Sequence, residues 1–147
     1  MALSVSEIFY SIQGESLYAG LPCAFVRLSG CNLRCRYCDT TYAYENGTPM
    51  AIEDIVRSLN AYKCPLIEVT GGEPLLQPQT PELITALLDH GHTVLLETNG
   101  TFSIQALDSR CVQIMDIKCP GSGEANKTDF SNFDHLQAKD QIKFVLT

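Results

Sequence analysis

The sequence is poor in basic residues. It has 10 Lys and Arg against 17 Asp and Glu, which gives a formal net charge of −7 at pH 7. A surface with this excess of acidic groups is unsuited to neutralising nucleic-acid phosphates. We therefore expect small-molecule partners and no nucleic acid.

The sequence also lacks long apolar runs. No stretch approaches the roughly 20 apolar residues that span a membrane, so no membrane partner is expected. Residues 1–4 have neither the basic segment nor the apolar core of a secretory leader. The seven cysteines are an odd number, and together these features indicate a reduced, cytoplasmic protein.

The pattern of apolar residues predicts one α/β domain. With 147 residues, 45% of them hydrophobic, the chain is long enough to bury a core. Five strands are predicted, at residues 23–29, 66–70, 93–97, 112–118 and 141–147. Helices are predicted at residues 52–59 and 80–91, with shorter ones around 104–107 and 133–138. We expect an extended arm and a turn in residues 1–22 and a turn cluster at 46–49. Strands that alternate with helices favour a parallel sheet, with ligands at the carboxyl ends of its strands.

Three cysteines stand out by their spacing. Cys31, Cys35 and Cys38 lie within eight residues in the pattern C-x3-C-x2-C. Three thiolates can hold three irons of a [4Fe–4S] cluster and leave the fourth iron open to a ligand. A zinc site would need a fourth ligand, and a disulfide would leave one cysteine over. Buried, inert thiols are the remaining alternative.

The residues around the triplet carry a resemblance to a known family. With Tyr37 before the last cysteine, the triplet resembles that of radical S-adenosylmethionine (SAM) enzymes. Residues 7–16, 25–27, 38–43 and 70–74 are similar to the 7-carboxy-7-deazaguanine synthase family. The resemblance implies an open, partial (βα)6 radical SAM barrel, here shortened to about five strands. It further implies a single radical SAM domain over residues 1–147 that lacks the C-terminal unit of the family.

The resemblance also implies an activity. Members of the family convert 6-carboxy-5,6,7,8-tetrahydropterin to 7-carboxy-7-deazaguanine with loss of ammonia, on the path to queuosine. This makes the expected protein a carbon–nitrogen lyase that uses a [4Fe–4S] cluster, SAM and Mg²⁺. An electron donor such as flavodoxin and a homodimer are the expected partners.

Candidate site residues follow from the same resemblance. It places the cluster that cleaves SAM on Cys31, Cys35 and Cys38, and Mg²⁺ on Thr40. It places SAM on Tyr37, Cys38, Asp39, Gly72, Glu73, Asp116 and Lys118. It places the pterin on Ile12, Gln13, Gly14, Arg27 and Thr70.

Two of these assignments have a physical basis with an open alternative. The guanidinium of Arg27, in an otherwise apolar strand, suits a bidentate grip on a carboxylate, but it suits a structural salt bridge too. Asp116 and Lys118 are two residues apart in a strand, so they share a face and can pair with each other or reach SAM.

Two other classes of function stay open. A different radical SAM enzyme, such as an activase that acts on a partner protein, shares the triplet and the G-G-E-P segment. A catalytically inactive module that holds zinc or an iron–sulfur cluster is the second alternative. Iron and sulfide analysis with a SAM titration separates the inactive module from both enzymes.

Overall fold

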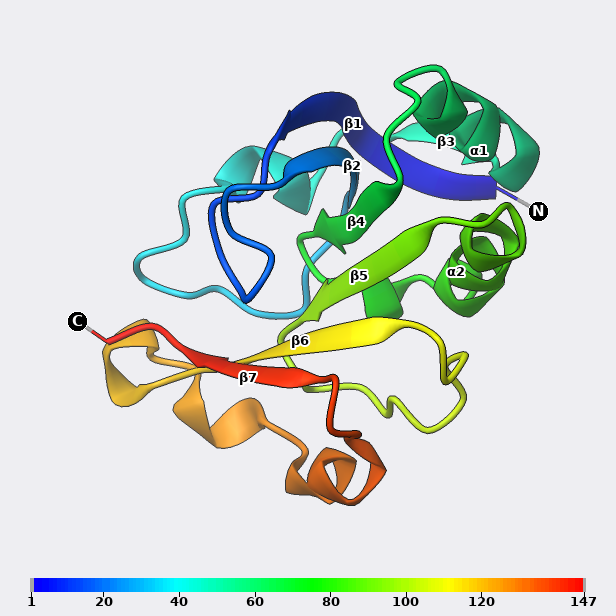
Figure 1. Ribbon diagram of the computed structural model, residues 1–147. Coiled ribbons are helices and arrows are strands. Elements are labelled where there is room, and N and C mark those ends of the chain that lie inside the picture. The colour runs from blue at the N-terminus through cyan, green and yellow to red at the C-terminus, as the bar shows by residue number, and fades with distance from the viewer. Residues whose placement is uncertain (1, 147) are drawn as a thin grey trace.

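The computed structural model describes residues 2–146, which form a seven-stranded sheet with the order β3-β1-β2-β4-β5-β6-β7 (Figure 1). The strands are β1 (Ala2–Ile12), β2 (Pro22–Leu28), β3 (Thr48–Ala51), β4 (Leu66–Gly71), β5 (Thr93–Thr98), β6 (Val112–Ile117) and β7 (Gln141–Phe144). The α-helices are α1 (Ile52–Asn60) and α2 (Thr80–Asp89). Short 3₁₀ helices are η1 (Thr41–Tyr44), η2 (Pro74–Leu76), η3 (Pro120–Ser122), η4 (Ala125–Lys127) and η5 (Phe130–His135).

The five predicted strands are present as β2, β4, β5, β6 and β7, and all five are parallel. Two antiparallel strands extend the sheet on the β2 side. Residues 1–22, expected to be a short arm, contain the 11-residue β1, which pairs with β2. The turn expected at 46–49 is wrong for Thr48 and Pro49, which are the first two residues of β3; this strand pairs with β1 and lies at the edge of the sheet. Pro49 fits there because an edge strand has a free side on which no backbone donor is needed.

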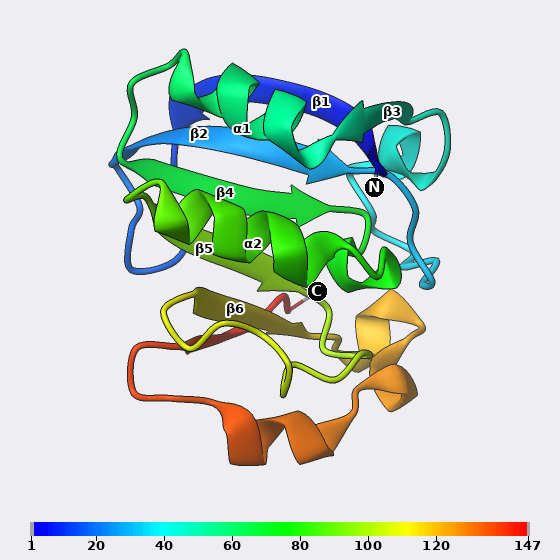
Figure 2. The same cartoon turned by 90° about the vertical axis from the view of Figure 1, so that its right-hand side faces the viewer.

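Both α-helices cover the same side of the sheet, as Figure 2 shows. The apolar positions predicted from their 3.6-residue period are buried: Ile52, Ile55, Val56 and Leu59 on α1, and Leu83, Ile84, Leu87 and Leu88 on α2. They pack on the apolar side chains of β2, β4 and β5 to form the main core. Neither helix of the described chain is both long and apolar enough to cross a bilayer.

The second half of the described chain has less helix than predicted. Residues 104–107 form a turn, so the helix expected there is wrong. The side chain of Asn132 accepts a hydrogen bond from the backbone N–H of Ile104 at 3.0 Å, which ties this turn to η5. The brief helix expected at 133–138 is the 3₁₀ helix η5, at 130–135.

Candidate functional site

A pocket of about 400 Å³ lies at the carboxyl ends of the parallel strands. Its strand residues alternate with core residues, because successive side chains of a strand point to opposite faces. Arg27 lies between the buried Val26 and Leu28, and Glu68 lies between the buried Ile67 and Val69. The face of the sheet that α1 and α2 do not cover therefore carries the polar side chains.

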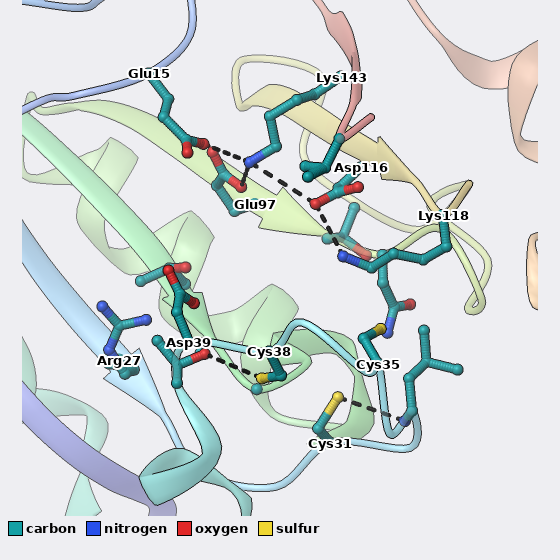
Figure 3. Close-up of a pocket in the computed structure, with 18 of the residues that line it drawn as sticks. Glu15, Arg27, Cys31, Cys35, Cys38, Asp39, Glu97, Asp116, Lys118 and Lys143 are labelled. Atoms are coloured by element: carbon teal, nitrogen blue, oxygen red, sulfur yellow. Dashed lines mark hydrogen bonds and ion pairs between the residues drawn. The ribbon is translucent and has the colours of Figure 1, made fainter. Parts of the chain in front are cut away.

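The three cysteines of the triplet line one part of this pocket, as predicted (Figure 3). They lie on the loop that follows β2, and none of them forms a disulfide. This loop packs closely on the loop after β4, where the Glu73 N–H donates to the Gly30 carbonyl at 2.7 Å. A Cβ on Gly72 would overlap that carbonyl oxygen, so only glycine permits this approach.

The thiols fit an iron–sulfur cluster better than a single metal ion. Within the described residues, no three His, Cys, Asp or Glu side chains converge closely enough to hold one ion. A four-iron cluster does not need such convergence, because thiolates bind it at separate corners. Burial raises the pKa of Cys31 and Cys35. Burial also acts on Cys38, but hydrogen bonds from Tyr44 and Thr40 outweigh it and lower the pKa of that thiol.

Several residues predicted to bind SAM lie around the same pocket. Tyr37, Asp39 and Gly72 line it, and so do Asp116 and Lys118 at the end of β6. Lys118 Nζ donates to Asp116 Oδ2 at 2.9 Å, and Asp116 Oδ1 is buried with no hydrogen-bond partner among residues 2–146. Burial lowers the pKa of Lys118, but Asp116 outweighs it and keeps that pKa above its ordinary value. The unpaired Oδ1 is an acceptor that a ligand hydroxyl or amine can satisfy.

Glu73 lies behind the pocket and does not line it. Its side chain is fully buried and accepts from Leu75 N, Thr98 Oγ1 and Asn99 N at 3.0, 2.8 and 2.7 Å. The carboxylate thus ties the loop after β4 to the carboxyl end of β5. A direct contact of Glu73 with SAM stays a prediction.

The residues predicted to bind the pterin are only partly brought together. Gln13, Arg27 and Thr70 line the pocket, as does Thr40, the predicted magnesium ligand. Ile12 and Gly14 lie outside the lining, and Ile12 is 65% exposed.

Three charged strand residues of the pocket were missed by sequence reasoning: Glu68 on β4, Glu97 on β5 and Lys143 on β7. Lys143 Nζ bridges Glu97 Oε2, 2.7 Å away, and Glu15 Oε2, 2.5 Å away (Figure 3). Each of the three interrupts an apolar strand. A charged residue within an apolar strand was the signal that identified Arg27, and the same signal could have identified these three residues.

The charged groups around Lys143 shift one another's pKa values. Burial, reinforced by the Glu97 charge, raises the pKa of Glu68 to about 8, although Gln13 and Lys143 oppose the rise. Burial likewise raises the pKa of Glu97 against the effect of Lys143. For Lys143, burial would lower the pKa, but Glu97 and Glu15 outweigh it and hold the pKa above its ordinary value.

Comparisons with known proteins match the chain to one family. Residues 25–110 match the model of the Radical SAM superfamily. A 7-carboxy-7-deazaguanine synthase of Chlorobaculum tepidum is 55% identical over 131 residues, which are 89% of this chain and 60% of that protein. One of Clostridium acetobutylicum is 40% identical over 154 aligned positions, covering all of this chain and 70% of that protein.

The curated relatives are longer than this chain, which spans 60%, 65% and 61% of the length of three of them. The crystal structure of QueE from Escherichia coli shares the fold, with a TM-score of 0.73 at 20% identity. That likeness covers 98% of this chain and 84% of the crystallised one.

Proposed function

Because the chain belongs to the Radical SAM superfamily and, within it, to the 7-carboxy-7-deazaguanine synthase family, we propose that it forms 7-carboxy-7-deazaguanine. The proposed substrate is 6-carboxy-5,6,7,8-tetrahydropterin, which loses ammonia in the reaction. Membership of the superfamily implies a [4Fe–4S] cluster and SAM.

One observation carries the proposal. The pocket has three free thiols in one part and a cation, Arg27, with several carboxylates in another. A site of this kind can hold SAM beside the cluster and a carboxylated heterocycle facing it.

Cys31, Cys35 and Cys38 would hold the cluster, which when bound would supply the electron for reductive cleavage of SAM and so the radical chemistry on the pterin. The chain itself orients both molecules and excludes water. The terminal nitrogens of Arg27 grip the pterin carboxylate, since only its Nε is bound to Glu7 among the described residues. Asp116 and Lys118 hold polar groups of SAM.

The finer assignments belong to the same proposal. Tyr37, Cys38 and Asp39 line the adenine of SAM, Gly72 and Glu73 lie nearest its amino group, and Thr40 is the protein ligand of Mg²⁺. Ile12, Gln13, Gly14 and Thr70 contact the pterin. The proposal also includes a flavodoxin-type electron donor, a homodimer, a cytoplasmic location and a single domain over residues 1–147.

Anaerobic reconstitution tests the function. The chain is loaded with iron and sulfide and supplied with a reductant, SAM, Mg²⁺ and the carboxylated tetrahydropterin, and the products are measured by mass spectrometry. We expect 7-carboxy-7-deazaguanine from the wild type and its loss in Arg27→Ala.

The other outcomes distinguish the alternatives. Formation of 5′-deoxyadenosine without the deazaguanine product would assign the chain to a different radical SAM reaction. Absence of both products from a fully loaded protein would identify an inactive iron–sulfur module. Omission of Mg²⁺, compared between the wild type and Thr40→Ala, tests the magnesium ligand separately.

A further inference from the structure

Lys143 joins three elements that meet at the pocket. It lies on the edge strand β7, and its ammonium group contacts Glu15 of the β1–β2 loop and Glu97 of β5. It also lies 3.9 Å from Asp116 Oδ2, on β6. Its side chain is 23% exposed, so water screens these contacts only in part.

Carboxyl groups outnumber ammonium groups around Lys143. Glu15 faces it from the β1–β2 loop, Glu68 from β4, Glu97 from β5 and Asp116 from β6. Asp116 already pairs with Lys118, and Glu68 accepts from the Gln13 amide. Lys143 is therefore the cation that keeps Glu15 and Glu97 together against their mutual repulsion.

Both of these carboxylates keep one oxygen for a ligand. Lys143 binds Oε2 of Glu15 and Oε2 of Glu97, and no donor in residues 2–146 reaches Oε1 of either. Carboxylate oxygens accept hydrogen bonds, so the pair is complementary to a heterocycle edge that carries N–H groups. The pyrimidine ring of a pterin has such an edge.

We propose that Lys143 is a positioning residue for the pterin, because it holds Glu15 and Glu97 where their free oxygens accept the N–H groups of the heterocycle. This inference rests on the function proposed above. Arg27 grips the substrate carboxylate at one end, and the pair ordered by Lys143 binds the ring at the other.

Binding measurements on the reconstituted 147-residue chain test this role. Lys143→Met removes the charge at similar length, Lys143→Arg keeps the charge, and Lys139→Ala is the matched control. Lys139 precedes the same strand, forms an ion pair with Asp140 and no other among residues 2–146, and does not line the pocket. Affinities for SAM and for the carboxylated tetrahydropterin are measured by anaerobic titration calorimetry.

We expect Lys143→Met to weaken pterin binding about ten- to a hundredfold. Without Lys143, Glu15 and Glu97 are no longer held in place, so their two charge-assisted hydrogen bonds to the pterin N–H groups are lost. Lys143→Arg should stay within about fivefold of the wild type, and all variants should bind SAM within about twofold. Equal loss of SAM and pterin affinity in Lys143→Met, or unchanged pterin affinity, would overturn the proposal.

The pH dependence separates positioning from a purely structural role. A carboxylate must be ionised to accept the ring N–H groups, and Lys143 lowers the pKa of Glu97. In Lys143→Met, pterin affinity should therefore fall at a higher pH on acidification than in the wild type. If pterin affinity fell at the same pH in Lys143→Met and in the wild type, the inference would be contradicted.

Hydrogen exchange tests Lys143 without any ligand. The amides of Glu15 and Leu17 donate to side chains, the latter to Gln141 of β7. Both should exchange at least about fivefold faster in Lys143→Met, but not in Lys143→Arg or Lys139→Ala. If the wild type fails to bind the pterin while this pattern holds, the proposed function fails and the ordering by Lys143 stands. Unchanged exchange in Lys143→Met refutes the ordering itself.

Discussion

The Nε of Arg27 donates to Oε1 of Glu7 at 2.7 Å, and the register of the β1–β2 pair makes these two residues direct neighbours. The salt bridge uses one edge of the guanidinium. The terminal nitrogens remain directed at the pocket (Figure 3), without a hydrogen-bond partner among residues 2–146. Arg27 can therefore form the salt bridge with Glu7 and bind a ligand carboxylate at the same time. Glu7 fixes the direction in which the guanidinium points.

The double use of Arg27 predicts that lysine cannot replace it. A single ammonium cannot pair with Glu7 and also donate two parallel hydrogen bonds to a carboxylate. We expect Arg27→Lys to weaken binding of the carboxylated pterin by about 1.4 to 2.8 kcal/mol, or roughly ten- to a hundredfold. Titration calorimetry with the pterin measures this loss.

Two comparisons make the Arg27 prediction specific. SAM affinity should stay unchanged in Arg27→Lys. A tetrahydropterin without the carboxylate should bind the wild type and Arg27→Lys equally. A lysine variant with full affinity for the carboxylated compound would exclude the grip.

The cysteine triplet predicts which thiols carry iron. Alanine at Cys31, Cys35 or Cys38 removes one of three protein ligands, so each variant should lose most of its iron, sulfide and visible absorbance after anaerobic reconstitution. Cys119→Ala is the control, since Cys119 follows the carboxyl end of β6 but does not line the pocket. Full iron content in all three triplet variants would rule out the cluster assignment.

Glu73 predicts a stability effect. Its fully buried carboxylate satisfies two backbone N–H groups and the Thr98 hydroxyl. Glu73→Ala leaves these donors without an acceptor, which we expect to cost about 3 to 5 kcal/mol of unfolding free energy. Glu73→Gln retains one acceptor oxygen and should cost about 1 to 3 kcal/mol.

Urea denaturation monitored by circular dichroism measures the Glu73 effect, with the exposed Glu45→Gln as a control expected within about 0.5 kcal/mol of the wild type. If Glu73→Ala were as stable as that control, its three hydrogen bonds would not support the fold.

Most of the fold could be predicted because apolar patterning encodes it. The five parallel strands and the buried faces of α1 and α2 follow from runs and periods that burial imposes. The open, partial radical SAM barrel is confirmed by the superfamily match and by the likeness to QueE. The antiparallel β3 was missed because Asn46-Gly47-Thr48-Pro49 has the composition of a turn, and an edge strand needs few sheet-forming residues.

The site was predicted where a local motif exists, and missed where tertiary structure assembles it. The cysteine triplet lies in one loop, so its spacing was visible in the sequence. Glu15 and Lys143 are 128 residues apart, and only the tertiary fold brings the β1–β2 loop and β7 into contact. Glu73 belonged to a recognisable motif, but its complete burial depends on Thr98 and Asn99 at the end of another strand.

Glu68 predicts an unusual pH dependence of stability. Burial and the nearby Glu97 raise its pKa from an ordinary 4.5 to about 8 in the folded state. The folded chain therefore holds this proton more tightly than the unfolded chain, and stabilisation present below pH 4.5 is lost as the pH rises through 8. At about 1.4 kcal/mol per pH unit, the whole window corresponds to on the order of 5 kcal/mol.

Glu68→Gln removes the titrating group but keeps an oxygen that can accept from Gln13. Between pH 5.5 and 9 the wild type should lose about 2 to 5 kcal/mol of unfolding free energy relative to this variant. Urea denaturation at the two pH values, under anaerobic reducing conditions, measures the difference. Glu53→Gln, an exposed carboxylate on α1, should parallel the wild type. If Glu68→Gln and the wild type lost stability equally over this range, Glu68 would be ionised in the folded protein at neutral pH, and Lys143 and Gln13 would outweigh its burial.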